Sequence, residues 1–178
     1  MAAPFWSGAS SAVQREEAVA LPNGSRVAIA VPAGFKFEQA RDAGGAPRAV
    51  LNAEGKASLE LSFLPDPEGK ELRLRGRNEL MVEFFQEYVA GSVERAMEFT
   101  ELSPRRGAGT LCVFTDAALA GKTDLPPGEH HQLTVGIKAW EGVMVVFRLF
   151  SQAVNSEAHL AALRVLRESV EERPVPLR

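Results

Sequence analysis

The chain has 178 residues, of which 20 are Lys or Arg and 23 are Asp or Glu, so its formal net charge at pH 7 is −3. Hydrophobic residues make up 46% and charged residues 24%, which are the proportions of one ordinary globular domain. Such a chain lacks the basic surface of a nucleic-acid binder, and no apolar stretch is long enough to span a membrane. The single cysteine, Cys112, excludes an internal disulfide framework and a zinc site built from several cysteines.

The first 12 residues are rich in small side chains and carry neither the basic segment nor the apolar core of a signal peptide. We expect a flexible leader at residues 1–22, one domain at 23–172 and a tail at 173–178, where two prolines prevent a helix from continuing. The sequence leaves two cellular locations possible. The protein is cytoplasmic if the leader is native, and periplasmic if a signal peptide has been removed.

Alternating apolar residues predict a strand at 26–31, and the pattern resumes at 35–37 after a Pro-Ala-Gly break. Residues 49–53 and 57–63 predict a hairpin around Gly55. One face of the second strand is polar and is expected to be wet: it consists of Ser58, Glu60 and Ser62.

The strongest helical periodicity lies in residues 79–99, with Asn78 as the expected N-cap and Ser103-Pro104 beyond the end. Opposite its apolar arc, six acids fall within an arc of roughly 100°. They are Glu79, Glu83, Glu87, Glu94, Glu98 and Glu101. Like charges four residues apart cost about 0.2–0.5 kcal/mol per pair. The favoured interpretation is a solvated face, and the alternative is a docking surface for a basic partner.

Further strands are predicted at 110–115, 131–138 and 143–150. The last of these is apolar on both faces, which indicates a central strand covered on both sides. A second helix is predicted from Ser156 to Glu172. Its expected core-facing residues are Leu160, Leu163, Leu166 and Val170. Because tight turns join the strands of each run, the sequence predicts an α+β fold, an antiparallel sheet flanked by helices on both faces (an αβα sandwich).

The order of these elements, together with a few short segments, resembles the Mog1/PsbP-like group and, within it, the bacterial DcrB-type proteins of the DUF1795 family. Val31-Pro32-Ala33-Gly34-Phe35 is similar to the family's hydrophobic-Pro-x-Gly-aromatic entry into the sheet. Residues 57–65, 79–99, 132–135 and 143–150 resemble its next strand, its long first helix and its late hairpin. The resemblance implies a sheet sandwiched between helices and an action by binding other proteins, with no shared catalytic residues.

No motif for catalysis or for a cofactor is complete, so we expect no cofactor and no metal. Gly121-Lys122-Thr123 has the end of a phosphate-binding loop, but Asp116 stands where that loop needs glycine. Cys112 lies among apolar residues and is interpreted as a buried hydrophobe. A basic patch before the first helix is interpreted as solvated: it consists of Lys70, Arg73, Arg75 and Arg77.

His130 and His131 are the best candidates for a ligand or metal site, with Arg148 from a neighbouring strand. If His131 begins a strand, the two side chains point to opposite faces and do not readily share one ion. The favoured interpretation is an exposed polar loop. His159 is interpreted as a surface residue.

Trp140 lies at a predicted hairpin tip, where it either packs under a loop or anchors a partner. We therefore expect a non-enzymatic adaptor, chaperone or accessory protein that binds another protein. The expected surfaces are the sheet face, Trp140, and the glutamates Glu83, Glu87, Glu94 and Glu98. The alternative is a small-molecule or metal-binding protein, or an enzyme, that uses His130, His131 and Arg148. The oligomeric state stays open, a homodimer included.

Overall fold

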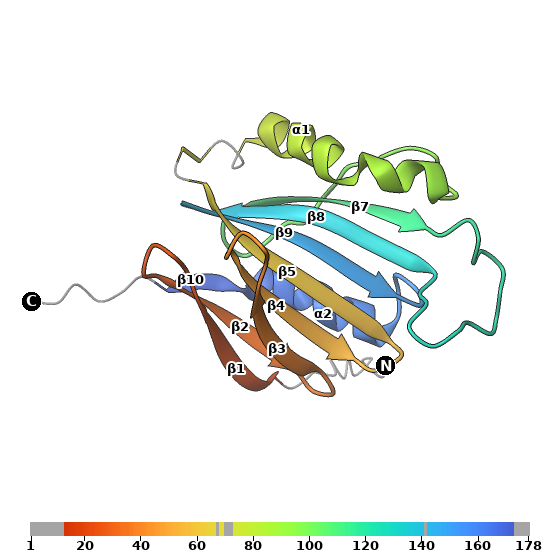
Figure 1. Cartoon of the computed structure of the whole chain (residues 1–178), viewed down its shortest axis with the longest axis horizontal. Coiled ribbons are helices and arrows are strands. Elements are labelled where there is room, and N and C mark those ends of the chain that lie inside the picture. The colour runs from red at the N-terminus through yellow and green to blue at the C-terminus, as the bar shows by residue number, and fades with distance from the viewer. Residues whose placement is uncertain (1–12, 67, 70–72, 141, 173–178) are drawn as a thin grey trace, which may run out of the picture.

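A computed structural model describes residues 13–66, 68–69, 73–140 and 142–172 (Figure 1). A larger sheet has seven strands in the order β3-β4-β5-β9-β8-β7-β6, and a smaller sheet has three in the order β1-β2-β10. The larger sheet comprises β3 (Lys36–Arg41), β4 (Pro47–Ala53), β5 (Ala57–Asp66), β6 (Thr100–Glu101), β7 (Ala108–Thr115), β8 (Gln132–Trp140) and β9 (Gly142–Ser151). The smaller sheet comprises β1 (Val13–Ala20), β2 (Arg26–Pro32) and β10 (Val170–Glu172). The helices are α1 (Leu74–Phe85), the 3-10 helix η2 (Gln86–Gly91) that follows it, and α2 (Glu157–Glu168).

The predicted fold class is confirmed. Every strand pair of both sheets is antiparallel, and helices lie on both sides of the larger sheet. In Figure 1, α1 lies above the larger sheet, while α2 and the smaller sheet lie below it. We call the face toward α1 the upper face and the face toward α2 the lower face.

The main core fills the space between the lower face, α2 and the smaller sheet. Alternate residues of the central strands point into it: Leu59, Leu61 and Phe63 of β5, and Val145, Phe147 and Leu149 of β9. A second core on the upper face packs Met81 and Phe85 of α1 against β7, β8 and β9. Strand β9 thus has buried side chains on both faces, which confirms the prediction of a covered central strand.

Trp140 lies in the lower core and is only 2% exposed. Its expected role as an exposed anchor is therefore wrong: the indole packs inside the protein, in the core that includes Val27 and Ile29 of β2, and not under a loop. The Lys138 Nζ lies 5.0 Å from the centroid of the Trp140 ring and donates a hydrogen bond to the carbonyl of Ser169, the C-cap of α2. Burial lowers the pKa of Lys138 to about 8, while the C-terminal end of the α2 dipole favours the cation.

Both ends of the predicted domain need correction. Residues 13–20 of the expected leader form β1, which pairs with β2. The charged, exposed side chains of this strand gave no apolar alternation to detect. The second helix ends at Glu168, and Val170 begins β10 on the other edge of β2. Residues 1–12 and 173–178 lie outside the described residues.

The set of α2 residues that faces the core also differs from the prediction. Ser156 caps the helix as expected, because its side chain accepts a hydrogen bond from the His159 amide. Small residues face the core next to Leu166, and Leu160 is half exposed. His159 is buried, not at the surface, and its Nδ1 lies 2.9 Å from the Ser151 Oγ.

Helix α1 begins at Leu74 with Arg73 as its N-cap, so Asn78 is not the N-cap, and Arg75 and Arg77 of the basic patch lie within the helix and not before it. Lys70 lies outside the described residues. Arg77 is buried and donates a hydrogen bond to the Thr110 hydroxyl at 3.0 Å. Arg75 stays exposed and pairs with Glu79. The main contacts of α1 with the upper face are with β7 and β8, and the half of that face formed by β3, β4 and β5 is left without a helix (Figure 1). This uncovered half positions the candidate site.

Candidate functional site

One row of paired residues crosses the upper face from strand to strand. Phe114 of β7 pairs with Leu133 of β8, which pairs with Phe150 of β9. Beyond Phe150 the row continues through Ser58 of β5 to Asn52 of β4. The row is therefore apolar near η2 and polar on the uncovered half of the sheet.

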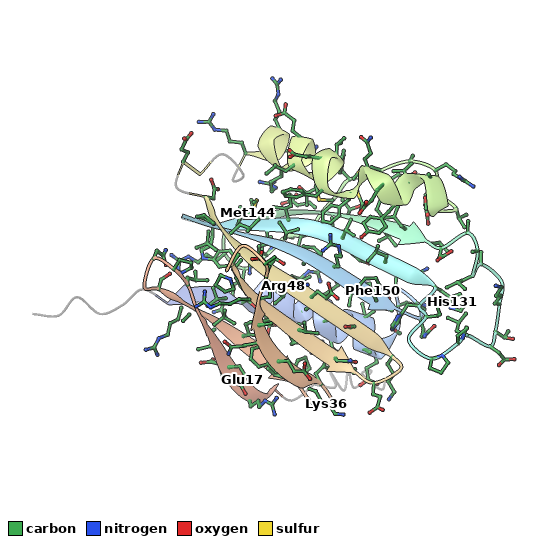
Figure 2. The ribbon with its side chains drawn as sticks, viewed as in Figure 1. Glu17, Lys36, Arg48, His131, Met144 and Phe150 are labelled. Atoms are coloured by element: carbon green, nitrogen blue, oxygen red, sulfur yellow. The ribbon has the colours of Figure 1, made fainter. Side chains whose placement is uncertain are left out.

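Two adjoining hollows lie along this row. The smaller hollow, of about 330 Å³, is lined by the three apolar residues of the row. The larger hollow, of about 610 Å³, is lined by the polar residues of the row together with Phe150. Gly128, Glu129 and His130 border both hollows. We call the two hollows together the sheet groove. Figure 2 shows Phe150 near the end of β9 and His131 on the loop that precedes β8.

Aromatic rings pack in pairs around the smaller hollow. Tyr88 of η2 lies against Phe114 with their ring centroids 6.1 Å apart, and His130 lies against Phe150 at 6.0 Å. Partial burial lowers the pKa of His130, which favours its neutral imidazole.

His131 also borders the smaller hollow, but the protein itself occupies both of its ring nitrogens. Its Nδ1 lies 3.2 Å from the Gln152 Oε1, and its Nε2 lies 2.7 Å from the Lys122 carbonyl oxygen. Because a carbonyl only accepts, Nε2 is the donor in that contact. The contacts indicate that His131 fixes the loop, while His130 is the imidazole that borders both hollows.

Arg148 is not brought together with the two histidines at either hollow; it belongs to the neighbouring row of the upper face. Its guanidinium carbon lies 5.7 Å from the centroid of the Phe85 ring. Its cross-strand neighbour is Glu60, whose carboxylate pairs with Arg48 at 3.3 Å. No three His, Cys, Asp or Glu side chains gather as a metal-binding group among the described residues.

Besides Tyr88, the titratable side chains that border the groove are carboxylates and the two histidines. Glu87, Asp116 and Glu129 border the smaller hollow, and Glu54 and Glu60 border the larger one. No Lys or Arg borders either hollow in the part of the chain that the structure describes. The groove therefore has an acidic lining although the chain as a whole is nearly neutral.

The predicted acidic face of one long helix is wrong. The α-helix ends at Phe85, and Glu94, Glu98 and Glu101 lie beyond the end of η2. The Glu94 carboxylate accepts hydrogen bonds from the Thr115 amide at 2.9 Å and from its hydroxyl at 2.7 Å, which ties this segment to the end of β7. Although partial burial opposes the shift, these hydrogen bonds lower the pKa of Glu94.

Glu94 is therefore expected to stabilise the fold instead of forming a docking surface. Glu94→Ala should lower the free energy of unfolding by about 1–2 kcal/mol, because it removes two hydrogen bonds to a charged acceptor. Glu98→Ala, at an exposed position of the same segment, should change it by less than about 0.5 kcal/mol. Urea unfolding at pH 7 measures both, and equal stability of the two variants would contradict the assignment.

Of the four glutamates expected to bind a partner, only Glu87 borders the groove; Glu83 is exposed on α1. Sequence reasoning identified Ser58 as part of a wet face, but it assigned neither Tyr88 nor Asn52 to a site. The alternation within each strand was visible, whereas the register that joins these residues into one row was not.

Comparison with protein-family models finds no matching family, and comparison with curated proteins finds no matching protein. Within the described residues, no helix has both the length and the apolar character needed to cross a membrane.

Proposed function

We propose that the protein is a non-enzymatic binding protein, an adaptor, chaperone or accessory subunit, that holds a segment of another protein in the sheet groove. The observation that carries this proposal is that the two hollows adjoin along one row of the upper face and share Gly128, Glu129, His130 and Phe150 in their linings. Both have exposed borders, including Glu87 on one side and Glu54 on the other, so a chain can enter from solvent.

The dimensions of the groove suit an extended segment. Neighbouring strands lie about 4.8 Å apart, so the row from β7 to β4 is roughly 19 Å long, the length of roughly six extended residues. An apolar floor at one end and a polar floor at the other would accept side chains of different character. Differences in character along a groove fix the register of a bound segment.

The resemblance to the DcrB-type proteins of the Mog1/PsbP-like group is part of this proposal. It implies an antiparallel sheet between helices, and members of the group act mostly by binding other proteins. We transfer that mode of action to this chain, and no particular partner.

Filling the larger hollow tests the proposal. Peptides would first be selected from a random displayed library on the wild-type protein. Ser58→Trp is expected to weaken their binding by about tenfold or more, because an indole replaces a hydroxyl in the groove floor. Ser62→Trp is the matched control: it is on the same strand and face, is equally half-buried, and lies outside the hollows.

The control should bind as the wild type does, and both variants should keep the melting temperature of the wild type. Selected peptides that bind Ser58→Trp as tightly as the wild type would show that the groove is not the docking surface.

A second candidate, a small-molecule binding protein, is favoured by the size of the smaller hollow, which lies within the usual range for ligand sites. It becomes the better account if the library yields no groove-dependent peptide. A small-molecule panel should then raise the melting temperature of the wild type and not that of His130→Ala.

A further inference from the structure

Three carboxylates from separate segments border the smaller hollow. Glu87 comes from η2, Asp116 follows β7, and Glu129 lies on the loop before β8. The ion pairs found among the described residues involve none of the three. Like charges around a hollow with an apolar floor focus a negative potential into it. A positively charged group that entered would relieve this repulsion.

The rings of the same hollow add a second, independent preference for a cation. Tyr88 and Phe114 pack together at one end of the apolar floor, and His130 and Phe150 at the other. The faces of aromatic rings carry negative charge density and attract ammonium and guanidinium groups. Carboxylates and aromatic rings that line the same hollow suit an organic cation.

The basic side chain in the next row of the upper face does not cancel this preference. Arg148 lies two residues from Phe150 on β9, so it occupies the next row and not the hollow. Its guanidinium group lies over Phe85, and its cross-strand neighbour Glu60 carries the opposite charge.

We propose that the smaller hollow binds the cationic side chain of a Lys or Arg from the partner segment. This inference rests on the proposed function, because it places the rest of that segment in the larger hollow. The occupant is a side chain and not a free amine because the two hollows adjoin at Phe150, which lines both. A backbone that leaves the smaller hollow there meets the amide of Asn52 and the hydroxyl of Ser58, which are hydrogen-bonding groups.

Blocked amino acids test this preference without a known partner. N-acetyl-lysine methylamide and N-acetyl-arginine methylamide are the cationic probes, and N-acetyl-norleucine methylamide is the neutral control of similar shape. Amide NMR titrations of the wild-type protein should show the cationic probes shifting the signals of Tyr88, Phe114 and His130, with little effect from norleucine. Equal binding of norleucine, or no shift with any probe, would overturn the inference.

Charge-neutralising variants identify the carboxylates that are responsible for binding the lysine probe. In the double variant Glu87→Gln, Glu129→Gln, the dissociation constant of the lysine probe should rise by about fivefold or more, because two carboxylates at the border are neutralised without a change of shape. The double variant Glu83→Gln, Glu98→Gln loses the same charge at exposed positions outside the hollow and should bind as the wild type does. Equal weakening in both variants would indicate a general effect of net charge and overturn the assignment to the hollow.

Two more outcomes separate this inference from the proposed function. Peptides that depend on Ser58 but bind equally well without Lys or Arg would overturn the inference and leave the proposed function standing. Tetramethylammonium that binds as tightly as the lysine probe, with no groove-dependent peptide found, would overturn both the partner side chain and the protein partner.

Discussion

Gly136→Ala is expected to lower the free energy of unfolding by about 2–3 kcal/mol, because a methyl group has no room at this position. Gly136 lies in the middle of β8 and pairs with Phe147 of β9 on one side and with Leu111 of β7 on the other. A Cβ atom there would lie 2.2 Å from the Phe147 Cζ and 2.5 Å from the Thr110 carbonyl oxygen. The carbonyl belongs to the backbone of β7, so it cannot withdraw without disturbing the β7–β8 ladder.

The matched control for this prediction is Gly44→Ala. Gly44 is exposed, and its nearest neighbour would be the Asp42 Oδ1 at 3.4 Å, an ordinary contact. Urea unfolding followed by circular dichroism should show a change of less than about 0.5 kcal/mol for the control. Phe147→Leu should restore part of the stability lost in Gly136→Ala, since it removes the ring atoms that clash. Equal stability of the two alanine variants would refute the packing described for β8.

Acid is expected to destabilise the protein through His159. Burial lowers the pKa of His159 to about 4, against about 6.5 for an exposed histidine. Between these pH values the unfolded chain binds a proton at this site and the folded chain does not, so stability falls as pH falls. The contribution is fully present above about pH 6.5 and is lost by about pH 4, a change of roughly 3 kcal/mol.

Unfolding in urea at pH 7.5 and at pH 4 measures this loss in the wild type and in His159→Gln. The variant keeps a polar group near the Ser151 hydroxyl, but glutamine does not titrate. Between pH 7.5 and pH 4, the free energy of unfolding should therefore fall by roughly 3 kcal/mol less in the variant than in the wild type. His130→Gln is the control, because His130 is only partly buried and should contribute less. An identical pH dependence of the wild type and His159→Gln would exclude His159 as the source.

Most of the larger sheet could be predicted from local patterns, because its strands are covered on one face or on both. The alternation in 57–63 and the two apolar faces of 143–150 are direct consequences of that burial. Strand β1 escaped detection because its described side chains are mostly exposed. The helix at 79–99 was predicted too long because amphipathic spacing continues past Phe85. The bonds from Thr115 to Glu94, which hold the following segment against β7, join residues 21 positions apart.

The candidate site depends on the same long-range information. His130 and His131 were identified by residue type, but their different surroundings follow from contacts with Phe150, Gln152 and Lys122. The burial of Trp140 also depends on long-range contacts. Its place in the chain indicated a hairpin tip. The smaller sheet that covers it is built from segments that lie more than 100 residues before it and 30 residues after it. The strand register and the elements that pack over each side chain decide which of these side chains are exposed to solvent. Neither can be read from a short stretch of sequence.

The position of β2 between β1 and β10 has a consequence for how the chain folds as it is synthesised. Residues 26–28 pair with residues 170–172, so the smaller sheet closes only when almost the whole described chain has left the ribosome. Until then, one edge of β2 offers unpaired backbone groups to other chains. A strand of three residues thus makes the closure of the smaller sheet a late event, and we expect the nascent protein to be prone to misassociation until residues 170–172 have emerged.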